Sequence, residues 1–231
     1  RRGYLPDPRD PRASPPKELY VVGRSGGEPR RLTKLGVDVE SPVWRPDSGG
    51  LAFTADTHQR DEHSYERADL WTVDLEGHLQ RLTEDRYHHS SPAWSPDGSS
   101  LVFRRMKGLD LVIEGKQDHG APIDLYLMPS AGGAMVNLTS AWDLRPEAPT
   151  WWSDDSRYVY FSSGIGGSTH LFRVPTEGGS VEQVTRGARR LSDFSLARNF
   201  QRMVYVSTDP VSPDELFAAG IDGSRESKLT S

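Results

Sequence analysis

Short apolar runs separated by turn-forming Gly, Pro, Asp and Asn residues recur along this chain. The runs LAF at 51–53, LVF at 101–103 and VYV at 204–206 belong to segments in which apolar and polar residues alternate, and this period of two predicts β-strands. Their short length and the dense turn signals between them favour an all-β fold.

A phrase of thirteen residues is written several times. SPAWSPDGSSLVF at 91–103 matches SPVWRPDSGGLAF at 41–53, APTWWSDDSRYVY at 148–160 and, more weakly, FSLARNFQRMVY at 194–205. An alignment without gaps places Trp44, Trp94, Trp151 and Leu196 at one position. Within the phrase, Pro-Asp-Gly and its variants, which include Asp47 and Asp97, predict a hairpin turn between two strands.

A second phrase follows each of these copies. It reads ADLWTVDLEGHLQRLT from Ala68 and IDLYLMPSAGGAMVNLT from Ile123, with further copies from Thr169 and Asp214, and a fifth from Lys17 precedes the first tryptophan phrase. Gly-Gly or Asp-Gly at its centre is a strong hairpin signal. Each unit therefore has four strands, as in the blades of a β-propeller.

The predicted fold is thus a β-propeller of about four whole blades plus a half blade. The proline-rich lead-in at 1–16 precedes repeat units at about 17–33, 41–83, 91–139, 148–185 and 194–230. Because no segment is left to complete the first half blade, we expect the chain to be part of a longer polypeptide. An irregular ring of four or five blades is the alternative.

The tryptophans are expected to pack against the next blade, since each sheet has two faces to cover. On this interpretation, Trp94→Ala costs about 3 to 5 kcal/mol if the ring is buried.

Composition excludes several classes of partner. With 28 basic and 33 acidic residues among 231, the net charge is −5, so no cationic field attracts nucleic acid or an anionic membrane. There is no cysteine, and hence no disulfide or thiolate metal site. No apolar run reaches the length of about 18 residues that a membrane span requires, and the charged start is unlike a signal peptide. We expect no cofactor.

The two phrases together resemble the blades of the prolyl oligopeptidase family of serine peptidases. They are also similar to the propeller of TolB. The tail VSTDPVSPDELFAAGIDGSRESKLTS from Val206 looks like the last blade of an acylaminoacyl-peptidase-like or dipeptidyl-peptidase-like member. The resemblance implies that the catalytic Ser, Asp and His belong to an α/β-hydrolase domain, whose access the propeller restricts to small peptides. That domain is absent from these residues, so we expect no catalytic triad here.

Three short motifs match known functional patterns, namely a nucleophile turn, a phosphate loop and a glycosylation sequon. The repeat accounts for them without such a function. GRSGG around Ser25 fits the G-x-S-x-G pattern, but sister repeats hold PSAGG and PTEGG there, so it is a hairpin tip. GIGGST at 164–169 lacks the lysine of a phosphate loop. Asn137 begins a glycosylation sequon at a position where other units read RLT.

The histidines are candidate metal ligands in two segments. His58 and His63 lie in a charged insert with Asp56, Asp61 and Glu62, and His88 and His89 enter a blade. Because ligands on one loop without HExxH-like spacing are usually a solvated loop, we expect no metal site.

Binding is expected on the face where the second and fourth strands of each blade end. Residues 54–67, 84–90, 104–122 and 141–147 should meet there, and long loops on a rigid scaffold commonly carry binding residues. Arg104, Arg105 and Lys107 are candidates for a peptide carboxylate, because guanidinium groups bind carboxylates in a bidentate way. The alternative is that they are exposed and balanced by nearby acids.

The sequence thus predicts the non-catalytic propeller of a serine peptidase, with small peptides reaching an attached hydrolase domain as its partners. A cytoplasmic location is expected, and a homo-oligomer remains open. The alternative is a TolB-like propeller that binds proteins, in which case the location would be periplasmic.

Overall fold

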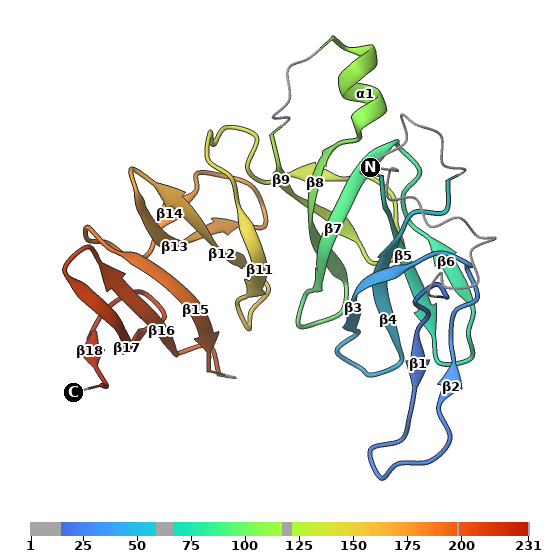
Figure 1. The fold of residues 1–231 in the computed structure, drawn as a ribbon, viewed down its shortest axis with the longest axis horizontal. Helices are drawn as coiled ribbons and strands as arrows, with labels where there is room; N and C mark the ends of the chain where they lie inside the picture. The colour runs from blue at the N-terminus through green and yellow to red at the C-terminus, as the bar shows by residue number, and fades with distance from the viewer. Residues whose placement is uncertain (1–14, 59–66, 117–121, 198, 231) are drawn as a thin grey trace, which may run out of the picture.

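The computed structural model describes residues 15–58, 67–116, 122–197 and 199–230. These residues form a series of small antiparallel sheets that follow one another in chain order (Figure 1). We number these sheets as blades 1 to 5, and the predicted propeller of four whole blades and a half blade is confirmed. Blades 1 and 5 lie at opposite ends of the molecule, so the described residues do not close into the alternative small ring (Figure 1).

Blade 1 has two strands and the other blades have four. Blade 1 consists of β1 (Tyr20–Val21) and β2 (Arg30–Arg31). Blade 2 consists of β3 (Val39–Trp44), β4 (Gly50–Ala55), β5 (Asp69–Asp74) and β6 (Leu79–Arg81). Blade 3 consists of β7 (Tyr87–Trp94), β8 (Ser100–Lys107), β9 (Asp124–Pro129) and β10 (Val136–Asn137).

Blades 4 and 5 continue the pattern. Blade 4 consists of β11 (Glu147–Trp152), β12 (Tyr158–Ile165), β13 (Ser168–Pro175) and β14 (Glu182–Gln183). Blade 5 consists of β15 (Arg190–Leu196), β16 (Arg202–Asp209), β17 (Ser212–Gly220) and β18 (Ser227–Lys228). A parallel bridge between Thr169 and Arg190 joins their sheets.

The second strand of blades 2, 3 and 4 is buried on both faces, because its side chains alternate between the two neighbouring blades. In β8, Leu101 and Phe103 pack toward blade 2, whereas Val102 packs toward blade 4. In β12, Phe161 faces blade 3 and Tyr160 faces blade 5. The hydrophobic core is therefore divided into four layers, one between each pair of successive blades.

The first hairpin of blades 2 to 5 turns on an Asx motif. The carboxylate of Asp97 accepts hydrogen bonds from the Ser95 hydroxyl at 2.6 Å and the Ser99 amide at 3.0 Å. The Asp47 carboxylate accepts a hydrogen bond from the Gly49 amide at 2.8 Å in the same way. The next residue has a positive φ, and this is where glycine is favoured: Gly98 occupies the position in blade 3 with a φ of 71°.

The tryptophan position needs a correction in blade 4. Trp94 pairs with Leu101 across its hairpin, and the residue that pairs with the equivalent Val159 is Trp152 rather than Trp151. The reason is one additional residue: the register shift of β11 runs from Glu147 to Trp151, whereas that of β7 runs from Ser90 to Ala93. The alignment without gaps was therefore wrong by one position.

The direction in which these rings pack also differs from the prediction. The indole of Trp94 donates to the Val43 carbonyl at 3.3 Å, and that of Trp152 donates to the Ala93 carbonyl at 3.2 Å, so both contact the preceding blade. Trp151 does face the next blade, where it meets Phe194 edge-on. Trp44 is 52% exposed, because the described part of blade 1 has no first strand to cover it.

Helix α1 (Leu109–Glu114) was not predicted. It lies in the insert after β8, between Gly108 and Gly115, and it is a single short turn of helix with Val112 buried. Among the described residues, no helix has the length and apolar character needed to cross a membrane.

Candidate functional site

The connections that follow the second and fourth strands meet on one face, which we call the loop face. Helix α1, in the insert after β8, is held by Arg86 of the connection between β6 and β7. The Arg86 guanidinium bonds Asp110 at 2.8 Å and Glu114 at 2.5 Å. Arg67, in the insert after β4, reaches the same Asp110 at 3.3 Å. Among the described residues, these contacts confirm the predicted meeting for the segments 54–67, 84–90 and 104–122.

A polar clamp, which the sequence analysis missed, recurs at the loop-face end of every blade. The threonine that ends the second phrase accepts a backbone N–H from the third strand at 2.8 to 3.1 Å. The same hydroxyl bonds the side chain that precedes that N–H. The five pairs are Glu18–Thr33, Asp69–Thr83, Asp124–Thr139, His170–Thr185 and Glu215–Thr230.

The residue two before the threonine is also part of the clamp. Where the clamp has an acid, the residue two before the threonine donates to it: Arg31 to Glu18 at 2.8 Å, or Lys228 to Glu215 at 2.9 Å. In blade 4 the acid is replaced by His170, and the partner position holds the neutral Gln183. The Gln183 amide donates to the Thr185 carbonyl instead. Blade 4 therefore keeps the bond from this position to the threonine carbonyl, which Arg31 and Arg81 also make.

His170 makes the blade 4 clamp sensitive to acid. Burial and the nearby Arg189 and Arg186 lower the pKa of His170, although its bond to the Gly187 carbonyl raises it. A histidine with a lowered pKa in the folded state stabilises the fold above its ordinary pKa of 6.5, and that stability is lost as the pH falls. We expect the unfolding temperature to drop more between pH 7.5 and 5.5 in the natural chain than in His170→Gln.

The matched control for this prediction is His78, which is exposed and bonds Asp74 at 2.7 Å. That bond raises the pKa of His78, so its contribution has the opposite sign and is lost as the pH rises. Thermal unfolding at both pH values for His170→Gln and His78→Gln measures the difference. Equal pH dependence in the natural chain and His170→Gln would contradict the prediction.

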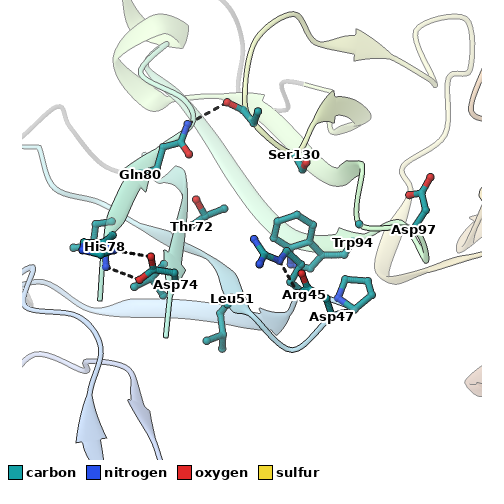
Figure 2. A pocket seen from close by; sticks show the side chains of 16 residues that line it. Arg45, Asp47, Leu51, Thr72, Asp74, His78, Gln80, Trp94, Asp97 and Ser130 are labelled. Carbon is teal, nitrogen blue, oxygen red and sulfur yellow. Dashed lines mark hydrogen bonds and ion pairs between the residues drawn. The ribbon is translucent and has the colours of Figure 1, made fainter. Parts of the chain in front are cut away.

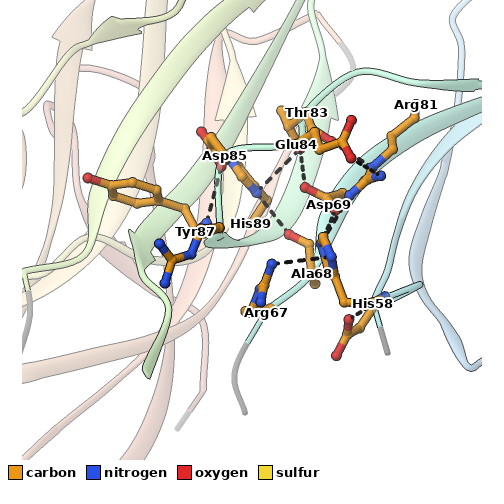
Figure 3. Close-up of polar contacts among 12 residues, drawn as sticks. His58, Arg67, Ala68, Asp69, Arg81, Thr83, Glu84, Asp85, Tyr87 and His89 are labelled. Carbon is orange, nitrogen blue, oxygen red and sulfur yellow. Dashed lines mark hydrogen bonds and ion pairs between the residues drawn. The ribbon is translucent and has the colours of Figure 1, made fainter. Parts of the chain in front are cut away.

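The clamp of blade 2 is the most connected of the five (Figure 3). The Asp69 carboxylate accepts hydrogen bonds from the Arg81 guanidinium at 2.5 Å and from the Thr83 hydroxyl at 3.0 Å. It also lies 2.9 Å from Nε2 of the His58 ring. The His58 ring in turn contacts Arg67 at 3.2 Å. This network ties the insert after β4 to the blade.

Asp85 and His89 lie beside this clamp (Figure 3). The Arg105 guanidinium donates to Asp85 at 2.7 Å and also lies over the Tyr87 ring. Burial would raise the pKa of Asp85, but the facing His89 ring and Arg105 together hold it far below its usual range.

The structure places the three predicted carboxylate-binding residues in β8. Arg105 is occupied by Asp85, and Arg104 lies 3.6 Å from Glu147. Burial lowers the pKa of Arg104, and its Nε atom has no hydrogen-bond partner. Both arginines are balanced by acids, as the alternative interpretation holds, although they are partly buried rather than exposed. Binding of a peptide carboxylate by Arg104, Arg105 and Lys107 stays a prediction.

The remaining sequence candidates occupy turns or the clamp. Ser25 lies in the turn between β1 and β2, and GIGGST forms the tight turn between β12 and β13. The Asn137 amide donates to Asp124 at 3.0 Å, so this residue belongs to the blade 3 clamp. His63, Asp61 and Glu62 lie outside the described residues.

A groove of about 620 Å³ opens at the turn end of blades 2 and 3, away from the clamps (Figure 2). It is lined by the first turns of both blades, by the Trp94 ring and by the His78–Asp74 pair. Ser130 lies well away from His78 in Figure 2, and no described hydrogen bond joins them. The groove therefore holds no Ser–His–Asp arrangement among the described residues.

The chain is similar to a peptidase in sequence, and to solved propellers in fold. No family model matches the chain. The chain is 26% identical to "Uncharacterized peptidase YuxL" of Bacillus subtilis (strain 168), in an alignment covering 92% of the chain and 45% of that protein. It therefore spans about half the length of this relative, to which its propeller is homologous.

Two solved structures share the fold at low sequence identity. A puromycin hydrolase matches 93% of the chain with a TM-score of 0.71 and 18% identity, over 35% of its own length. TolB from Acinetobacter baumannii matches 92% of the chain with a TM-score of 0.63 and 19% identity, over 48% of its own length. The predicted resemblance to peptidase propellers and to TolB is confirmed.

Proposed function

We propose that this propeller is the non-catalytic part of a serine peptidase of the prolyl oligopeptidase family and limits which peptides reach an α/β-hydrolase domain. The observation that supports this most is the similarity along 92% of the chain to a peptidase of which it spans 45%. The fold of puromycin hydrolase, which shares the blades, adds to it.

The contacts of the described side chains support a propeller that does not itself hydrolyse peptides. Hydrolysis by a serine peptidase requires a nucleophile, a base within hydrogen-bond reach and a donor set for the oxyanion. The repeated polar residues here instead bond each other within a blade, as Asp69 and Thr83 do. A rigid stack of blades with closed clamps suits a filter, because a filter must keep its shape while peptides pass.

The proposal predicts that the chain alone does not hydrolyse aminoacyl, dipeptidyl or acyl-peptide p-nitroanilides. The measurement is the release of p-nitroaniline, followed by its absorbance over hours at high protein concentration. Ser25→Ala is the matched variant, because Ser25 is the one serine in a G-x-S-x-G pattern. Turnover by the natural chain that disappears in Ser25→Ala would contradict the proposal.

A TolB-like protein-binding propeller is the second candidate, supported by the TM-score of 0.63 to TolB. The coding sequence after Ser231 separates the two. A following region of roughly 200 to 250 residues, the size of a domain, with GxSxG and then Asp and His supports the peptidase. A stop codon supports the binding module, for which a periplasmic rather than a cytoplasmic location is proposed.

A further inference from the structure

His89 presents a buried ring nitrogen that no hydrogen bond satisfies. Its side chain is 0% exposed, and its Nδ1 lies 2.8 Å from the Ala68 carbonyl. A carbonyl only accepts, so Nδ1 carries a proton. The other nitrogen, Nε2, has no hydrogen-bond partner and faces Asp85 Oδ1 at 3.4 Å (Figure 3). Buried polar atoms without a partner are rare and point to an absent proton, water or ion.

Nε2 of His89 and Oδ1 of Asp85 face each other without a hydrogen bond. When Nδ1 carries the single proton of the ring, both of these atoms are acceptors, and a cation between them would satisfy both. The separation of 3.4 Å is longer than an ordinary N–H···O bond. Two ligands of a tetrahedral ion, each about 2.0 to 2.1 Å from the metal, lie about 3.3 Å apart. The observed spacing therefore matches two neighbouring metal ligands.

Asp69 is the third residue of this group, and its Oδ1 accepts the Thr83 hydroxyl, which lies 3.4 Å from Nδ1 of His89. One ligand atom each from Asp69, Asp85 and His89 lie within 4.8 Å of one another. Arg81 holds Oδ2 of Asp69, and Arg105 holds Oδ2 of Asp85, so each carboxylate keeps Oδ1 turned to other partners. Oδ1 of Asp69 accepts only the Thr83 hydroxyl among its described bonds, which leaves it a lone pair.

The surrounding contacts are those that orient metal ligands. A ligating histidine commonly donates its other N–H to a backbone carbonyl, and ligating carboxylates are themselves hydrogen-bonded. The Ala68 carbonyl, Arg81 and Arg105 take these places here. The three residues come from β5, the connection after β6 and β7, which lie next to one another at the junction of blades 2 and 3.

We propose that Asp69, Asp85 and His89 form a binding site for one divalent ion of the zinc or manganese class. One imidazole nitrogen and two carboxylate oxygens suit these ions better than calcium or magnesium, which prefer oxygen ligands alone. The ion would join the end of blade 2 to the start of blade 3 on the loop face. Because two arginines neutralise the carboxylates, the affinity is expected to be moderate.

The test is titration of the whole chain, freed of metal by a chelator, with Zn²⁺ and Mn²⁺ by calorimetry, and with Co²⁺ by visible absorption. One equivalent should bind, and Co²⁺ should give the spectrum of a site with nitrogen and oxygen ligands. His89→Gln and Asp85→Asn should weaken binding about 100-fold. His78→Gln is the matched control, because it removes an exposed His–Asp pair and should change nothing.

Binding of none of these ions up to millimolar concentration, or equal binding by His89→Gln, would overturn the proposal. Long-range ¹H–¹⁵N spectra of the natural chain cover the case in which His89→Gln does not fold. If Nε2 binds the metal, its ¹⁵N resonance should shift on addition of Zn²⁺. A His89 ring that carries protons on both nitrogens with and without Zn²⁺ would show that a proton, not a metal, supplies the charge.

Discussion

Replacing Trp152 by alanine is expected to lower the free energy of unfolding by about 3 to 5 kcal/mol. The ring is 8% exposed and packs in the core layer between blades 3 and 4, beside Val102 and Phe161. Its removal leaves a cavity that rigid neighbouring sheets fill only partly. It also leaves the Ala93 carbonyl without the indole N–H that bonds it at 3.2 Å. Urea denaturation followed by circular dichroism measures the loss.

Trp44→Ala is the matched control, because Trp44 pairs with Leu51 as Trp152 pairs with Val159. Its ring is 52% exposed, so the same truncation should cost less than about 1 kcal/mol. Trp94 is half-buried, so the cost of Trp94→Ala should lie between the costs of Trp152→Ala and Trp44→Ala. If all three substitutions cost the same, the position in the repeat rather than the depth of burial would decide stability, and the prediction would be wrong.

The repeat explains why the fold was predictable. A period of two within phrases such as LVF, and a turn built on Asp97, specify hairpins without reference to the rest of the chain. Several copies of one pattern then constrain the architecture, because a single four-stranded blade cannot bury both faces alone. The observed pairing of β7 with β8 and of β8 with β9 follows this pattern.

The register of blade 4 shows where the same reasoning fails. APTWWS offers two tryptophans, and the preceding Pro149 favours Trp151 when no gap is allowed. The hairpin turn gives the better signal: Ser153 bonds Asp155 at 2.6 Å as Ser95 bonds Asp97 at 2.6 Å. A serine two residues before the turn aspartate fixes the alignment from the turn backward and identifies Trp152.

The loop face was predictable in outline but not in its contacts. Strand order determines that the connections after β4, β6 and β8 share one face. Which side chains meet there depends on helix α1 and on the inserts, whose lengths differ between blades. The clamp could have been found, since an acid or histidine stands before each LW, LY or LF and a threonine ends each unit. The closeness of Asp69 to His89 crosses a blade junction and has no local signal.

Asp69→Ala is expected to cost about 3 to 5 kcal/mol, the usual result of removing one partner of a buried ion pair. The carboxylate is 1% exposed. Its loss leaves Arg81, the Thr83 hydroxyl and the His58 ring without the group that they share. Unfolding should be followed in urea with a chelator present, so that any bound metal does not contribute to the difference.

Glu215→Ala tests whether burial, rather than the clamp pattern, sets this cost. Glu215 bonds Lys228 and Thr230 as Asp69 bonds Arg81 and Thr83, but its side chain is 20% exposed and that of Lys228 is 45% exposed. Water screens such a pair, so its loss should cost much less than the loss of Asp69. In the double variant Asp69→Ala with Arg81→Ala, no guanidinium is left unpaired, and part of the loss should be recovered. A double variant as unstable as the sum of both single changes would show that the two side chains stabilise blade 2 independently.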